Sequence, residues 1–220
     1  MENQKSYTPK KGRYKNDLPH WQWKNAIYFV TFRLYGSLPK SVIQRLKDER
    51  ELQRKKLIEK GLSEQATKLA LKKMHHLYFG KFDHLLDNSN SGPHHLKNDE
   101  FAKIVADTIM HFNEERYVII NYTIMSNHVH LVIYKLQLEL HEIMGSIKKY
   151  SGRKINLEIH KTGCQFWQYE SFDHIIRSED ELNYYIQYNL LNPVTANLIS
   201  NWKNWKWNYI HKDFLNYAPI

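Results

Sequence analysis

The sequence predicts an α+β fold, namely a ferredoxin-like (RRM-like) antiparallel sheet with helices on one face, plus a helical insertion. Three observations predict it. Alternating β-branched and apolar residues indicate strands, apolar residues at helical spacing indicate helices, and the two kinds follow in the order strand, helix, strand, strand, helix, strand, helix. This order gives two split βαβ units. Residues 40–95 add helices after the first strand and form an insertion within a single domain spanning 1–220.

The first elements are a strand and the two helices of the insertion. Residues 26–34, AIYFVTFRL, are rich in β-forming side chains, which favours a strand. Pro39 then introduces a strongly charged helix over 40–60. Ser63 is a good N-cap residue and begins a second helix, which we expect to end near residue 77.

A core helix and a strand pair follow the insertion. Residues 99–113 place apolar side chains near helical spacing, which predicts an amphipathic helix. Residues 117–125 and 128–134 are rich in β-branched and apolar residues and indicate two strands. Ser126 and Asn127 between them suit a tight turn, so these strands are expected to be antiparallel neighbours.

The last core elements are a helix, a strand and a helix. Residues 140–157 carry an apolar stripe and a basic far end, and residues 166–176, FWQYESFDHII, indicate a strand with a bend in its middle. Ser178 opens a capping-box pattern that begins a helix over 179–191. Pro193 is expected to help end that helix.

Composition and charge favour a nucleic-acid-binding protein. Thirty-two Lys and Arg oppose 23 Asp and Glu, and aromatic residues make up 14%. This balance suits a polyanion with bases that can stack, although many basic proteins never contact nucleic acid. The single cysteine, Cys164, excludes an intrachain disulfide and a cysteine-based zinc site and favours a reducing cytoplasm. No run approaches the ~18–20 apolar residues of a membrane span, and the polar N-terminus lacks the apolar centre of a signal peptide.

The most informative motif is His128-Val129-His130, which lies inside the strand over 128–134. Side chains two apart on a strand project to the same face. The two imidazoles therefore lie side by side, and a pair of neutral imidazoles can bind one divalent cation. The alternative is an ordinary strand with one buried and one surface histidine.

The last helix carries a candidate nucleophile. Tyr188 falls at the boundary of the core face, where its hydroxyl stays reachable, and Asn192 lies beside it, four residues on. A tyrosine near a metal can attack phosphorus, and an amide oxygen is an acceptable ligand for Mg²⁺ or Mn²⁺. The alternative is that Tyr184, Tyr185 and Tyr188 are three packing residues.

Three motifs in this order, MSNHVHLVI, FWQYESFDHII and YIQYNLLNPV, resemble the single-tyrosine HUH transposases. Within that class they are most similar to the REP-associated tyrosine transposases and related transposase-like proteins. The resemblance covers roughly residues 14–199 apart from the insertion. Two positions depart from the family pattern. Ser126 stands where the family usually has proline, and Thr195-Ala196-Asn197 stands where basic residues and then glycine commonly follow Asn-Pro-Val.

The resemblance implies a metal-dependent transposase that cuts and rejoins single-stranded DNA. It implies that His128 and His130 bind Mg²⁺ or Mn²⁺, and that Asn192 holds the position of a polar third ligand. Tyr188 would form a 5′-phosphotyrosine link, which a free 3′-hydroxyl can later attack. Family members typically recognise a DNA hairpin with a tetranucleotide beside it, as monomers or homodimers. The implied setting is the bacterial cytoplasm with the nucleoid, and no membrane.

Two basic segments are candidate DNA contacts, because basic arms commonly contact phosphates or grooves. For the N-terminal segment the alternative is a solvated tail. The tryptophan-containing residues 200–220 are expected to pack as a capping segment, with stacking on bases as the alternative. The candidate DNA-binding residues are Lys10, Lys11, Arg13 and Lys15 near the N-terminus and Lys148, Lys149, Arg153 and Lys154 at the end of the helix over 140–157.

Three other functions stay open. A domesticated protein would keep the fold and the hairpin binding without cleavage, but His128, His130 and Tyr188 are intact, and an unused site would drift. An RNA-binding module also suits a ferredoxin-like sheet, yet no strand carries the RNP1 aromatic pattern. A hydrolytic zinc enzyme is disfavoured because the helical His-Glu-x-x-His spacing is missing.

Overall fold

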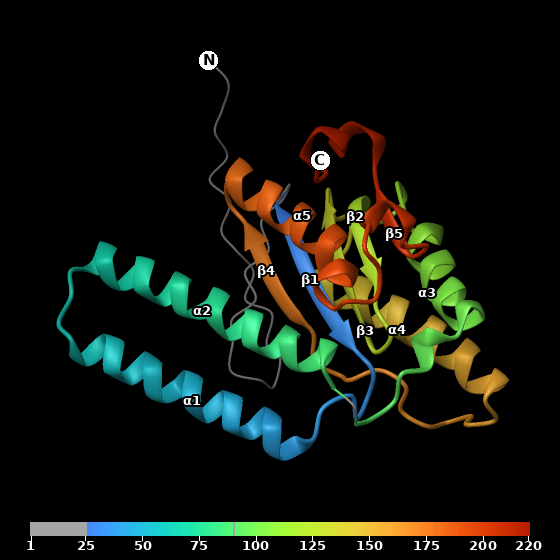
Figure 1. Ribbon diagram of the computed structural model, residues 1–220, viewed down its shortest axis with the longest axis horizontal. Helices are drawn as coiled ribbons and strands as arrows, with labels where there is room; N and C mark the ends of the chain where they lie inside the picture. The colour runs from blue at the N-terminus through green and yellow to red at the C-terminus, as the bar shows by residue number, and fades with distance from the viewer. Residues whose placement is uncertain (1–25, 90) are drawn as a thin grey trace.

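The computed structural model describes residues 26–89 and 91–220, which form a five-stranded sheet flanked by helices (Figure 1). Strand β3 has the bounds expected from the sequence, and β1, β2, α1, α3 and α4 lie within two residues of theirs. The elements are β1 (Ile27–Arg33), α1 (Lys40–Glu59), α2 (Glu64–Asp87), η1 (His95–Lys97), α3 (Asp99–His111), β2 (Val118–Ile124), β3 (His128–Tyr134), α4 (Leu140–Glu158), β4 (Phe172–Ile176), α5 (Glu179–Thr195), η2 (Trp202–Asn204), β5 (Asn208–Ile210) and η3 (Lys212–Tyr217).

The strands run in the order β4-β1-β3-β2-β5, and each neighbouring pair is antiparallel. The predicted α+β fold with an antiparallel sheet is therefore confirmed. Strand β3 lies at the centre, where His130 stands opposite Thr31 of β1 and Thr123 of β2. The central position buries β3 along almost its whole length, because neighbouring strands cover its edges and helices cover its faces.

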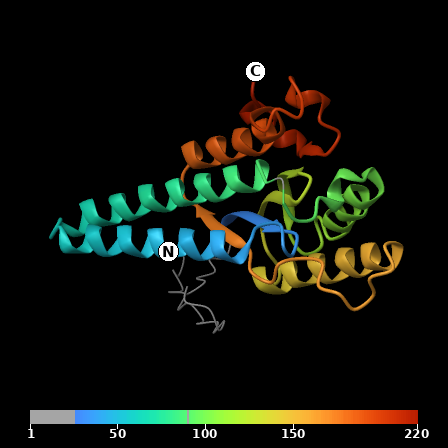
Figure 2. The same cartoon turned by 60° about the horizontal axis from the view of Figure 1, so that its bottom comes forward.

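Helices cover both faces of the sheet, not one face as predicted. On one face, Tyr28, Val30 and Phe32 of β1 belong to a core shared with α3 and α4. On the other face, the ring of Phe29 stacks on that of Tyr185 of α5, with ring centroids 4.3 Å apart. Figure 2 shows α5 above the sheet and α4 below it. Strand β1 carries apolar side chains at consecutive positions, so both of its faces need cover.

Helices α1 and α2 form an antiparallel pair that extends away from the sheet, while the last turns of α2 return to it (Figures 1 and 2). Helix α2 continues to Asp87, well beyond the expected end near residue 77, although Gly80 lowers its helix propensity. Phe79, Asp83 and Leu86 are buried in these turns, and such packing outweighs propensity. No helix in the described part of the chain is long and apolar enough to cross a membrane.

The expected fourth strand is divided in the structure. Trp167 makes an isolated bridge just after the end of β1, and β4 begins only at Phe172. Between them, the Lys148 ammonium donates hydrogen bonds to the carbonyls of Gln168 and Tyr169. These bonds direct the carbonyls toward α4, so pairing with β1 is interrupted until Phe172.

Helix α5 continues through Pro193 to Thr195, so the prediction that Pro193 helps end the helix near residue 191 is wrong. Proline has no backbone N–H and leaves the carbonyl four residues earlier, that of Asn189, without its helical donor. The Thr123 hydroxyl of β2 donates to this carbonyl at 2.7 Å. The sheet thus supplies the missing donor, and the helix persists.

Residues 200–220 contribute a strand that the sequence did not predict. Strand β5 pairs with β2 at the edge of the sheet. The indole N–H of Trp205 donates to the Ile124 carbonyl at 3.2 Å, and that of Trp207 donates to the Asp99 carboxylate at 3.0 Å. Three residues are too few for an alternating pattern to be recognised in the sequence.

Candidate metal and tyrosine site

His128 and His130 lie on the same face of β3, the face that α5 and the end of α2 cover. Both side chains are fully buried, and their Nε2 atoms are 3.0 Å apart. The alternation of side chains along a strand places the two rings on one face. The register of the sheet then places them at its centre, so the two imidazoles meet inside the protein.

Hydrogen bonds at the other ring nitrogens fix how the imidazoles are presented. Asn127 donates its amide to the Leu86 carbonyl at 2.9 Å, so its amide oxygen faces His128 Nδ1, at 2.7 Å. An amide oxygen only accepts, so His128 carries its proton on Nδ1 and presents a lone pair at Nε2. His130 Nδ1 lies 2.8 Å from the Thr31 hydroxyl. Such outer hydrogen bonds are the usual way in which metal-binding histidines are oriented.

A third residue, Asp83 of α2, completes the cluster. Its side chain is fully buried, and its Oδ1 lies 3.3 Å from His130 Nε2 and 3.6 Å from His128 Nε2. Ligand atoms of these three residues lie within 4.8 Å of one another, close enough to hold one metal ion. Asp83 lies in none of the motifs that the sequence singled out. The one signal that could have found it is its place between Phe79 and Leu86 on the buried side of α2.

Helix α5 brings Tyr188 and Asn192 to the same carboxylate. The Tyr188 hydroxyl donates a hydrogen bond to Asp83 Oδ2, and the Asn192 amide donates to the same oxygen at 3.0 Å. The ring centroids of Tyr188 and His130 are 5.8 Å apart. The structure therefore places together the four residues singled out on two separate motifs, around a carboxylate contributed by α2.

The electrostatics of the cluster leave the imidazole of His128 neutral and Asp83 charged. Burial lowers the pKa of His128 to about 3. Burial opposes ionisation of Asp83, but its interactions with His130 and the hydrogen bond from Tyr188 outweigh it and hold the pKa of this carboxyl at about 2. Burial and then the charge of Asp83 raise the pKa of Tyr188 well above its usual range, so the phenol stays protonated.

The donor set fits a divalent cation. Asp83 Oδ1, Asp87 Oδ1 and Asn192 Oδ1 are buried and lack a hydrogen-bond partner among residues 26–89 and 91–220. Asp87 Oδ1 also lies 3.7 Å from His128 Nε2. Ionised carboxylates and amide oxygens accept but do not donate, and buried acceptors without donors are costly unless something positive binds them. The cluster has the composition of a cation site.

The predicted DNA-binding residues lie elsewhere. Lys10, Lys11, Arg13 and Lys15 fall outside the described residues. Lys148, Lys149, Arg153 and Lys154 are on α4, which covers the opposite face of the sheet from the histidines. Three of them are exposed, whereas Lys148 is mostly buried, and burial lowers its pKa to about 8. Lys148, Lys149 and Arg153 line a cavity of about 960 Å³ together with Phe166 and Trp167.

Comparisons with known proteins give a family match and a solved structure of similar fold. Residues 93–189 match the family described as "Transposase IS200 like"; the match includes His128, His130 and Tyr188 and leaves out Asp83 and Asn192. A solved structure described as "Structure of the REP associates tyrosine transposase bound to a REP hairpin" has the same fold, with a TM-score of 0.55 and 13% sequence identity. The alignment covers 90% of this chain and 84% of that chain. No curated protein sequence matches the chain.

Proposed function

We propose that this chain, whose residues 93–189 match the IS200-like transposase family, is a metal-dependent endonuclease and strand transferase for single-stranded DNA. The observation that carries the proposal is the convergence of Tyr188, His128 and His130 on the carboxylate of Asp83. A phenol beside a cation site suits nucleophilic attack on a phosphodiester. The similar structure contains a bound hairpin, which supports hairpin DNA as the substrate class.

Four residues would hold the cation in this proposal. His128 and His130 would bind through Nε2, Asp83 through Oδ1 and Asn192 through its amide oxygen. Mixed nitrogen and oxygen ligands are acceptable to Mn²⁺ and Mg²⁺, and the two imidazoles favour Mn²⁺ of the pair. The ion would neutralise charge on the phosphate and offset the charge of Asp83.

Tyr188 supplies the nucleophilic oxygen in the proposed reaction. The phenolic oxygen forms a bond to phosphorus as the bond from phosphorus to the 3′ oxygen breaks. The phenolic proton passes along the hydrogen bond to Asp83 Oδ2. The departing 3′ oxygen takes a proton from water to become a hydroxyl, and Asp83 returns its proton to solvent. The 5′-phosphate then remains on Tyr188. Attack of a 3′-hydroxyl on this link reverses the step and joins DNA ends.

The test is a denaturing gel that detects a covalent protein–DNA adduct. Single-stranded hairpins from the DNA flanking the gene are incubated with Mn²⁺ and the wild-type protein or the variants Tyr188→Phe and His130→Ala. We expect an adduct with the wild type and none with either variant. Tyr184→Phe is the matched control, because Tyr184 lies one turn earlier on α5 and is 51% exposed. An adduct that survives Tyr188→Phe overturns the assignment of the nucleophile.

A hairpin-binding protein that does not cleave is the second candidate function. The observation that favours it is the hydrogen bond from Tyr188 to buried Asp83, which holds the phenol protonated. Hairpin binding in a gel-shift assay, without an adduct at any Mn²⁺ concentration, would support this candidate and contradict the enzyme. We propose that the protein binds the hairpin as a monomer or a homodimer. The mass of the protein–hairpin complex in solution distinguishes the two.

A further inference from the structure

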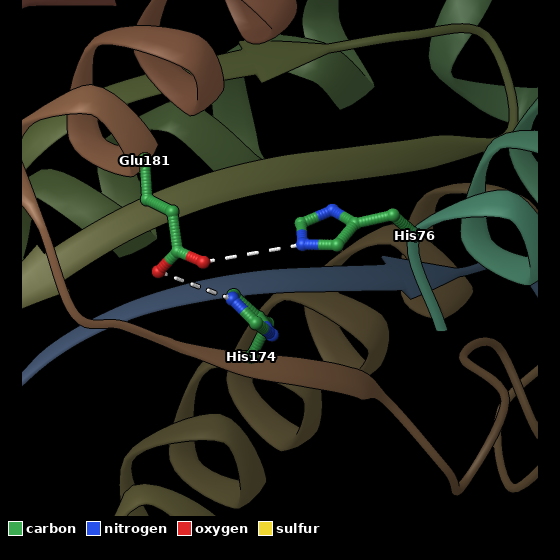
Figure 3. Close-up of side chains that lie close together, drawn as sticks. All are labelled: His76, His174 and Glu181. Atoms are coloured by element: carbon green, nitrogen blue, oxygen red, sulfur yellow. Dashed lines mark ion pairs between the residues drawn. The ribbon is translucent and has the colours of Figure 1, made fainter. Parts of the chain in front are cut away.

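A second cluster of metal-ligating side chains lies on the same side of the sheet. It consists of His76 of α2, His174 of β4 and Glu181 of α5, whose side chains point toward one another (Figure 3). His174 and Glu181 are only 7% and 8% exposed. His174 Nε2 lies 3.7 Å from Glu181 Oε2, and His76 Nε2 lies 4.0 Å from Glu181 Oε1. Helix α2 and the consecutive elements β4 and α5 thus contribute one ligand each.

The polar atoms of this cluster are incompletely bonded. His174 Nε2 is buried and has no hydrogen-bond partner in the described part of the chain. Burial lowers the pKa of His174 to about 4, so the imidazole is neutral near pH 7. His76 Nδ1 lies 3.3 Å from the Tyr185 hydroxyl. When Nδ1 donates that hydrogen bond, His76 Nε2 is left as an acceptor facing Glu181, as in oriented metal ligands.

The spacing is that of a site for one small ion. Two ligand atoms bound to the same tetrahedral Zn²⁺ are about 3.3 Å apart, given bonds of about 2.0–2.1 Å. The corresponding atoms here are within 4.8 Å of one another, so small rotations of the side chains close the site. We propose that His76, His174 and Glu181 bind a second divalent cation, of the borderline class represented by Zn²⁺, because two imidazoles and a carboxylate select that class.

Lys72 competes with the cation for Glu181. Its ammonium pairs with Glu181 Oε1, and its side chain is 45% exposed. When this lysine turns into solvent its ammonium is hydrated again, and the incoming cation takes over neutralisation of the buried Glu181 carboxylate, which would otherwise be left as an unpaired charge. Binding of a cation therefore displaces Lys72, and removal of this lysine strengthens cation binding.

The second site would fasten α2 to the sheet. His76 and Asp83 are seven residues apart on α2, and their partners Glu181 and Tyr188 are seven residues apart on α5. The helices thus run in the same direction with two contacts spaced by two turns, about 10 Å. A cation bound by His76, His174 and Glu181 would hold α2 against α5 and β4. It would thereby fix the position of the helix that carries Asp83. This inference does not depend on DNA cleavage.

The experiment counts zinc ions bound to the full-length protein. Zn²⁺ is titrated against a chromophoric chelator, and thermal unfolding is followed with and without Zn²⁺. We expect His76→Ala and His174→Ala each to bind one equivalent fewer than the wild type and to lose part of the zinc-dependent rise in Tm. His84→Ala is the matched control, because His84 is an exposed histidine of α2 outside both clusters. Lys72→Met is expected to bind Zn²⁺ several-fold more tightly.

Either of two results would overturn the proposal. One is an unchanged zinc stoichiometry in both His76→Ala and His174→Ala, and the other is a Lys72→Met variant that binds no tighter than the wild type. Asp83→Asn separates this site from the proposed catalytic site. That variant should lose an equivalent that the His76 variant retains, so failure at one site is distinguishable from failure at the other.

Discussion

The carboxylate of Asp83 accepts a hydrogen bond from the hydroxyl of Tyr188, although 105 positions separate the two residues in the chain. The remaining oxygen of Asp83 faces the Nε2 atoms of two histidines. One buried carboxylate therefore contacts both the candidate nucleophile and the candidate cation ligands, and it lies on a helix outside the segment that matches the transposase family.

Asp83→Asn should weaken cation binding and slow adduct formation together. Asparagine keeps the shape of the side chain but removes the negative charge that offsets a divalent ion. We expect the Mn²⁺ concentration needed for half-maximal adduct formation to rise by roughly 10–100-fold, the range seen when groups that support a metal are removed. Asp48→Asn, on exposed α1, is the control. An unchanged Mn²⁺ dependence would exclude Asp83 as a ligand.

Tyr188→Phe should destabilise the protein as well as abolish the adduct. The substitution removes a hydrogen bond to a buried charged oxygen, and loss of such a bond costs about 1–3 kcal/mol in the free energy of unfolding. Urea unfolding in the presence of a metal chelator measures the difference. Tyr184→Phe should have little effect, because that side chain is half exposed. Equal stability of the two variants would show that the bond contributes nothing.

Because of Asp87, the free energy of unfolding should decrease as the pH rises toward neutrality. Burial, and then the charge of Asp83, raises the pKa of Asp87 to about 7 from an ordinary value of 3.8. Between these two values the folded protein binds more protons than the unfolded chain, so the contribution of Asp87 to the free energy of unfolding decreases with pH. That contribution is fully lost only above about pH 7.

Asp87→Asn tests this pH dependence. The variant should be more stable than the wild type above pH 7, by at most about 4 kcal/mol, and should show little advantage near pH 4. Urea unfolding of both proteins across this pH range, with a chelator present, gives the difference. A stability difference that is independent of pH would argue against titration of Asp87.

The carbonyl of Asn189 links Thr123 to Pro193 energetically. Thr123→Val should cost about 1–3 kcal/mol, because it leaves this buried carbonyl without a donor. Pro193→Ala restores a backbone N–H at the position from which a helix normally bonds that carbonyl. A double-mutant cycle should therefore show coupling, with the valine substitution costing less in the alanine background. Strictly additive effects would contradict this account of why α5 passes through Pro193.

Lys149 and Arg153 are exposed on α4, where they line the cavity that also contains Phe166 and Trp167. We expect both side chains to contact DNA phosphates. Replacing both with alanine should weaken hairpin binding at low salt. The slope of log K against log salt concentration should become shallower by roughly 1.5, since each lost phosphate contact contributes about 0.7–0.9. Lys103→Ala, at a lysine that already pairs with Asp107, is the control. An unchanged slope would place the DNA on another surface.

Some features of the site follow from local sequence alone. The alternation of a strand places His128 and His130 on one face, and the spacing of a helix places Tyr188 beside Asn192. The fold class was predicted correctly for the same reason, since periodicity in polarity reports which side of each element is buried. These are short-range properties, and each can be inferred within a single motif.

Other features were decided only by tertiary packing. Asp83 reaches the histidines because the buried Phe79 and Leu86 hold the end of α2 against the sheet, beyond the point where propensity favoured a helix. Cover on both faces of the sheet, the division of the fourth strand by Lys148 and the added β5 also depend on partners distant in the chain. Periodicity shows that a face is buried but not which element buries it. The sequence thus determined the two motifs, while long-range packing determined the carboxylate that joins them.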